Sequence, residues 1–211
     1  MTDLSWTTNW DSIVYMENGL ATNQYTMTIY FDVATEDGDE QTIAFERIKF
    51  FVEDVLDTAI ITNIENEHNH WFMQNMKQRM VTTPGDPTDL LLAAALFSKF
   101  NQITEDKLIV SKIELESKLA NNIKIHFTEE FAEESTGLLE HPGITESKKA
   151  PWWNRTDSGS ADYFTFDSQG AILYISDISN WEDAELNWIK SDNEPESKWK
   201  PTIIPGGKTL N

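Results

Sequence analysis

The sequence predicts an α+β protein in which a mainly antiparallel sheet is covered on one face by helices. Residues 90–97 are apolar on nearly every side, which is typical of a helix buried on more than one face. Residues 109–116 and 123–128 alternate apolar and polar side chains, a pattern typical of strands with one buried face. We therefore expect the helix to cover the apolar face of this hairpin. That face consists of Ile109, Ile113, Leu115, Ile123, Ile125 and Phe127.

Both ends of this unit carry recognisable signals. Asp86 suits the N-cap of the helix, and Pro87 suits its first position because the missing N–H would be unpaired there. Asp89 favours the positive end of the helix dipole. Asn121 and Asn122 tolerate positive φ, so they predict a tight turn between the two strands.

The N-terminal part predicts strands separated by turns. Residues 12–16 indicate a short strand, and an Asn-Gly turn follows at 17–19. Residues 25–33 alternate regularly and predict the best early strand. Residues 36–39 indicate a turn, and 40–43 the beginning of a return strand.

Helical periodicity follows. Apolar residues recur at helical spacing from about 45 to 58, and we expect a helix there. Residues 60–63 are interpreted as an apolar connector, and 65–80 as a weaker helix anchored by Trp71.

The composition divides the chain into three parts. Residues 1–131 form the sheet-and-helix domain, and 132–150 are acidic and without periodicity, as in a loop or linker. Residues 151–211 are Trp-rich, with an expected hairpin over 163–175 and a short helix beginning at Asn180. So many tryptophans are untypical of a disordered acidic tail, and we expect this extension to pack on the first part or on a partner subunit.

The charge and the missing cysteines exclude several functions. The 211 residues carry a net charge of −20, which argues against binding nucleic acid through its phosphates. The acidity fits simple solubility best, with a basic partner or mimicry of nucleic-acid charge as alternatives. Without cysteine, neither disulfides nor thiolate metal sites can form. No apolar stretch reaches the roughly 20 residues of a membrane span, and the N-terminus lacks signal-peptide features, so we expect a cytoplasmic protein.

The order of predicted elements from residue 25 to 130 resembles the tunnelling fold, shared by 6-pyruvoyl-tetrahydropterin synthase, its queuosine-pathway relatives and GTP cyclohydrolase I. FERIKFFVEDVLD (45–57) is similar to the first helix of that family, and DPTDLLLAAALFSKF (86–100) with LIVSKIELES (108–117) to its Pro-Thr-started helix and following strand. The similarity covers about half of the chain. It implies a homo-oligomer that binds a planar pterin- or purine-like heterocycle, with Glu116, or otherwise Glu114, as the anchoring carboxylate.

The sequence departs from the family where zinc would bind. The early strands carry no histidine, and Thr58 follows the Leu56-Asp57 pair where the synthases usually have a catalytic histidine. Leu90 and Leu91 stand where the family often has Glu-Asn. The resemblance therefore implies a fold and a binding position without the zinc-dependent reaction.

Two clusters are candidates for chemistry. Glu114 and Glu116 share a strand face, and His126 on the neighbouring strand completes an acid–base set. The simpler interpretation is a solvated face balanced by Lys112 and Lys124.

His68 and His70 form the second cluster. On a helix, residues two apart point about 200° away from each other, so both cannot bind one metal ion from a regular turn. In an extended segment they would share a face and could bind one together, with Glu65 and Glu67 nearby. No third ligand accompanies them, and we expect neither a bound metal nor a cofactor.

Three functions remain open, and whether the protein is an enzyme is open with them. The first is a tunnelling-fold-like protein that binds a heterocycle through Glu116. The second is a non-enzymatic acidic interaction or assembly protein, whose Asn-rich, cysteine-free composition resembles proteins of marine tailed phages. The third is a metal-dependent hydrolase using His68 and His70. The chain carries no Gly-x-Ser-x-Gly elbow and no phosphate-binding loop.

Overall fold

The structure is a computed structural model. It describes residues 4–17, 19–76, 78–134, 137–140, 151–159, 161, 164–166 and 172–174. The helix expected from Asn180, and residues 141–150 of the expected linker, lie outside the described residues. Within the expected C-terminal hairpin, β7 (Phe164–Phe166) and β8 (Ile172–Tyr174) pair antiparallel.

The α+β class is confirmed, but the main sheet is mixed. Its six strands lie in the order β4-β3-β1-β2-β5-β6. Four strands form an antiparallel unit: β1 (Leu4–Met16), β2 (Gly19–Val33), β5 (Leu108–Ser117) and β6 (Lys124–Thr128). Two short strands extend it in parallel: β3 (Ile60–Asn63) and β4 (Met80–Thr83).

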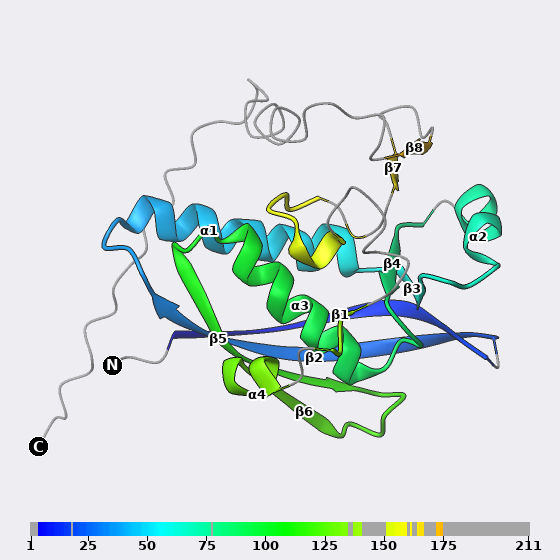
Figure 1. Cartoon of the computed structure of the whole chain (residues 1–211), viewed down its shortest axis with the longest axis horizontal. Coiled ribbons are helices and arrows are strands. Elements are labelled where there is room, and N and C mark those ends of the chain that lie inside the picture. The colour runs from blue at the N-terminus through cyan, green and yellow to red at the C-terminus, as the bar shows by residue number, and fades with distance from the viewer. Residues whose placement is uncertain are drawn as a thin grey trace, which may run out of the picture.

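The two long helices cover the same face of the sheet (Figure 1). They are α1 (Gly38–Phe50), which continues into a π-helix, η1 (Phe51–Leu56), and α3 (Asp89–Ile103). Short helical segments complete the described chain: α2 (Asn69–Asn75), α4 (Glu129–Glu134) and a 3-10 turn, η2 (Trp152–Asn154).

The predicted contact between the apolar helix and the hairpin is confirmed. Leu92 and Leu96 of α3 are buried, as are Ile113 and Leu115 of β5 and Phe127 of β6. All of these residues belong to one hydrophobic cluster, against which Ile125 also packs. The expected position of Ile123 on this face is wrong, because it lies before β6 and is 63% exposed. Because α3 is buried nearly all round, it forms the centre of the core.

The expected position of Ile109 on this inner face is wrong. Tyr30 pairs with Lys112 and Phe31 with Val110, so Ser111 is an extra residue in β5. Such a β-bulge shifts the alternation by one residue. Val110 is consequently buried, and Ile109 is 42% exposed on the other side.

Both long helices begin at other residues than expected. Residues 40–43 do not form a strand but lie in α1, because the Asp37 carboxylate accepts hydrogen bonds from the N–H groups of Asp39 and Glu40 and caps the helix. Thr88, rather than Asp86, caps α3 by accepting a hydrogen bond from the Leu91 N–H at 3.3 Å. The asparagine turn is confirmed, with φ near 54° and 57° at Asn121 and Asn122.

The segment between η1 and α3 also differs from expectation. The expected connector at 60–63 is β3, and the expected helix over 65–80 is reduced to α2. Phe72, 4% exposed, anchors α2 against Ile60 and Met80, whereas Trp71 is 55% exposed. The assignment of the anchor to Trp71 is therefore wrong.

Three tryptophans join the main core. Trp10 stacks on Tyr25 at 5.0 Å between ring centroids. It lies on β1, and this strand begins eight residues before the strand expected at 12–16. Trp152 and Trp153 are both 1% exposed, and Trp152 stacks on Phe51 at 5.6 Å. The Trp152 indole N–H donates to the Thr82 carbonyl at 2.7 Å.

Candidate functional site

The outer face of the antiparallel strands collects the polar residues singled out in the sequence. Because side chains alternate along each strand, Glu114 and Glu116 of β5 share this face with His126 of β6. Glu114 lies opposite His126, and Glu116 lies opposite Lys124. The three expected site residues are therefore neighbours, while their role stays a prediction.

Glu114 is the centre of an ion-pair cluster. Its carboxylate lies 2.8 Å from the Lys112 ammonium, 3.3 Å from that of Lys124 and 3.4 Å from Nδ1 of His126. The hydrogen bond from Lys112 is the largest of the causes that lower the pKa of Glu114 to about 2. At neutral pH the Glu114 carboxylate is therefore ionised and forms ion pairs with both lysines.

Lys112 is held from two sides. Its ammonium lies 3.8 Å from the centroid of the Tyr30 ring on β2, in addition to its contact with Glu114. The hydrogen bond to Glu114 raises the pKa of Lys112. Sequence alternation places Lys112 on this face, but the contact with Tyr30 depends on how β2 pairs with β5.

Glu116 differs from its neighbour. Within the described part of the chain it makes no hydrogen bond or ion pair, and its side chain is half-buried. In the pairing of β2 with β5, Thr26 lies opposite Glu116. The Thr26 hydroxyl does not bind Glu116 but donates a hydrogen bond to Oδ1 of Asn9 at 2.7 Å. The Glu116 carboxylate can therefore accept hydrogen bonds from a ligand, whereas the neighbouring Glu114 carboxylate is already paired with Lys112, Lys124 and His126.

This difference decides what the face can do chemically. A general acid or base works best with a pKa near the working pH, and the low pKa of Glu114 places it far from neutrality. At neutral pH the Glu114 carboxylate is therefore ionised and paired with its neighbours, whereas Glu116 has no hydrogen-bond partner among the described residues.

The histidine pair of the sequence analysis lies at the start of α2 (Asn69–Asn75). His68 is the N-cap residue of α2, and its ring lies 5.7 Å from that of Tyr15 in an edge-to-face contact. No group of three His, Asp or Glu side chains that could hold a metal ion occurs among the residues the structure describes. His68 contributes to aromatic packing.

The segment that follows the Leu56-Asp57 pair fixes the backbone of β1. The Asp57 carboxylate accepts a hydrogen bond from the Asp11 N–H at 3.1 Å, and the Thr58 N–H donates to the Asp11 carbonyl at 2.6 Å. Thr58 adopts φ 60°, which turns the chain from η1 into β3. These contacts are structural.

A second unusual carboxyl, that of Asp89, lies at the start of α3. Oδ2 of Asp89 lies 2.8 Å from the Ser117 hydroxyl. Burial raises the pKa of Asp89 and that of the adjacent Tyr25. Only tertiary structure brings these residues together, so no sequence pattern marks them.

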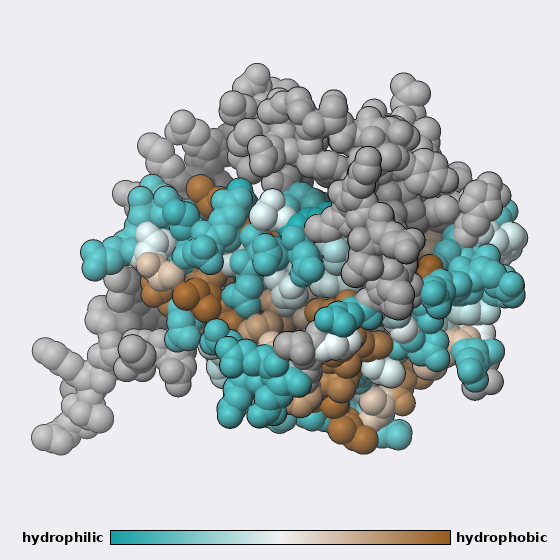
Figure 2. Space-filling model, in the orientation of Figure 1, coloured by the Kyte–Doolittle hydropathy of each residue, from teal (hydrophilic) through white to brown (hydrophobic). Residues whose placement is uncertain are grey.

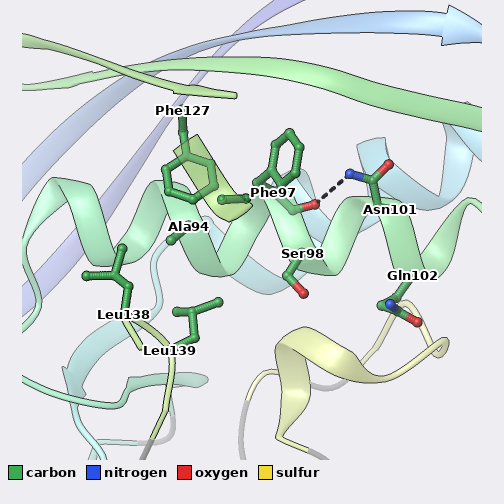
Figure 3. Close-up of a pocket in the computed structure, with 9 residues that line it drawn as sticks. Ala94, Phe97, Ser98, Asn101, Gln102, Phe127, Leu138 and Leu139 are labelled. Atoms are coloured by element: carbon green, nitrogen blue, oxygen red, sulfur yellow. Dashed lines mark hydrogen bonds between the residues drawn. The ribbon is translucent and has the colours of Figure 1, made fainter. Parts of the chain in front are cut away.

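A hollow of about 290 Å³ opens between α3, β6 and α4. In Figure 3, Ala94 of α3 lies between the Phe127 ring and the side chains of Leu138 and Leu139. Ser98 and Gln102 continue the lining along the same helix (Figure 3). This hollow lies on the helical side of the sheet, away from Glu116.

No protein-family model matches the chain, and a search of curated proteins finds no match. None of the helices in the described residues is long and apolar enough to cross a membrane.

Proposed function

We propose that the outer face of β1, β2, β5 and β6 binds a planar polar heterocycle of the pterin or purine type, with Glu116 as the anchoring acceptor. One observation supports this proposal above others. Glu116 has no described partner, whereas the nearby Glu114 is saturated by Lys112, Lys124 and His126. A carboxylate can accept two hydrogen bonds from adjacent N–H groups of such a ring, and charge-assisted bonds of this kind are strong.

The proposal includes a homo-oligomer. β6 is the last strand in the sheet order, so one side of its backbone has no strand neighbour in the described chain. An unpaired edge is a template for pairing with another chain. A second subunit at this edge would place further side chains beside Glu116 and exclude water from it.

A titration tests the binding site. Purified protein is titrated with pterins and purines by calorimetry, in parallel with Glu116→Gln and with Glu46→Gln, an exposed site on α1 that carries the same charge change. We expect Glu116→Gln to weaken binding about tenfold or more, because a hydrogen bond to a charged group is lost. Glu46→Gln should have no effect. Binding unchanged in Glu116→Gln would exclude Glu116 as the anchor.

The alternative is a non-enzymatic acidic interaction protein, favoured by the net charge of −20. Light scattering after size-exclusion chromatography separates the two functions. A monomer that binds no heterocycle would favour the interaction protein. An oligomer that binds pterin or purine would favour the heterocycle site.

A further inference from the structure

The hollow beside α4 has an aromatic floor. The rings of Phe97 and Phe127, which both line the hollow, lie 5.3 Å apart between centroids. Leu138 and Leu139 close one side, and Ala132 of α4 contributes to the rim. A surface of this composition binds apolar groups.

The size and polarity of the hollow limit what it can hold. Its volume of about 290 Å³ lies at the lower end of the roughly 300–1,000 Å³ of small-molecule sites. The polar atoms along α3 are largely occupied: the Asn101 amide pairs with the backbone of Val110, and the Ser98 hydroxyl contacts Oδ1 of Asn154. Such sites usually have converging polar groups to orient a ligand, so one large apolar side chain fits this hollow better.

The rim of the hollow is acidic. α4 carries four exposed glutamates, Glu129, Glu130, Glu133 and Glu134. A fifth, Glu140, directly follows Leu139. None of these carboxylates forms an ion pair with another described residue. Figure 2 shows the hydrophilic surface of α4 next to hydrophobic residues.

We propose that this hollow is the docking site for a basic peptide segment of a partner protein, which inserts one large apolar or aromatic side chain between Phe127 and Leu139. Lysine or arginine residues on either side of the inserted residue would face the glutamates of α4. Charge complementarity of this kind speeds association and selects the partner. The same charges repel anionic membranes and nucleic acids. The site is independent of the outer sheet face and of Glu116.

Selection from a random peptide library displayed on phage tests the proposal. The immobilised full-length protein should enrich peptides in which a Phe, Trp, Leu or Met is flanked by Lys or Arg. The enriched peptide, labelled with fluorescein, is then titrated by fluorescence anisotropy. Its affinity should fall as salt rises, because salt screens the exposed charges of the rim.

Two variants locate the binding. Ala132→Trp fills the hollow from α4 and should weaken binding about tenfold or more. Glu133→Gln with Glu134→Gln leaves the hollow open and should weaken binding about threefold while flattening its salt dependence. Glu53→Gln with Asp54→Asn removes the same charge from exposed positions on η1 and should have no effect. Amide chemical shifts of the wild-type protein should change at α4 and around Phe127.

Several outcomes would overturn the proposal. Selected peptides without enrichment in Lys and Arg would exclude a basic partner. Binding equally strong in Ala132→Trp, with shift changes confined to other elements, would exclude this hollow. Binding of apolar dyes alone, with no peptide enriched, would identify a small-molecule cavity instead.

Discussion

The side chain of Asn101 pairs with the backbone of Val110 as a neighbouring strand would. Its Oδ1 accepts a hydrogen bond from the Val110 N–H at 2.9 Å, and its Nδ2 donates to the Val110 carbonyl at 3.2 Å. β6 pairs with β5 only from Lys112 to Glu116, so it does not reach this position. Val110 is 1% exposed, and its backbone groups therefore need a partner within the protein.

We expect Asn101→Ala to destabilise the protein by about 1–3 kcal/mol or more, because it leaves a buried N–H and a buried carbonyl unsatisfied. Gln102→Ala is the control, since Gln102 is the exposed neighbour and its loss should change stability by less than about 0.5 kcal/mol. Urea unfolding followed by tryptophan fluorescence measures both. Equal midpoints for the two variants would show that water replaces Asn101 at no cost.

Leu92→Ala should cost about 2–5 kcal/mol, because Leu92 lies at the centre of the core and is 1% exposed. Leu91→Ala should cost clearly less, because Leu91 is only half-buried. The same urea titration compares the two variants. A larger loss at Leu91 than at Leu92 would contradict the packing of α3.

The sequence predicts the fold where a local pattern coincides with the tertiary contact. The alternation of β2 and the all-round apolarity of α3 are sufficient for this. The bulge at Ser111 has no such signal, because an extra residue breaks the alternation without changing the composition. The sequence of residues 60–63 indicates only a connector, because a short apolar run has no diagnostic period, and the parallel pairing of β3 with β1 shows it to be a strand.

The candidate site is likewise predictable only in part. Alternation alone places Glu114 and Glu116 on one face. Alternation does not predict which glutamate forms the ion pairs with the lysines. Lys124 lies opposite Glu116, yet its ammonium contacts Glu114. The hollow lined by Phe127 and Leu139 joins segments distant in sequence, and no motif marks it.

Lys99 of α3 is fully buried and fixes residues 155–157 to the helix. Its ammonium donates to the carbonyl oxygens of Arg155, at 3.1 Å, and of Asp157, and lies 3.9 Å from Oδ2 of Asp157. Lys99→Met should lower the free energy of unfolding by about 3–5 kcal/mol, because the buried carbonyl groups and the Asp157 carboxylate lose the ammonium group that pairs with them.

The control for this change is Lys107→Met, which breaks the exposed ion pair with Glu40 and should cost under about 1 kcal/mol. Urea unfolding gives both values. Fluorescence of the buried Trp152 and Trp153 should shift to longer wavelength in Lys99→Met alone if the segment loosens. A cost below that of Lys107→Met would show that the buried ammonium contributes nothing.

The ion pairs of Glu114 predict how stability depends on pH. Its pKa in the folded protein is about 2, below the ordinary value of 4.5. A lowered pKa means that the ionised carboxylate stabilises the fold, so this contribution is complete above pH 4.5 and is lost as the pH falls toward 2. A shift of this size corresponds to about 3 kcal/mol by linkage. Lys112 and Lys124 are 32% and 46% exposed, however, and solvent screening should reduce it to about 1 kcal/mol.

Unfolding free energies of the wild type and of Glu114→Gln, measured by urea titration between pH 6 and pH 2, test this expectation. Their difference should be largest above pH 4.5 and shrink toward pH 2. Raising the salt concentration should reduce the difference at every pH, because the cluster lies on an open sheet face. Glu46→Gln is the matched control and should show no such pH dependence. A constant difference across the whole range would mean that Glu114 titrates normally, and the ion pairs with Lys112 and Lys124 would then not persist in solution.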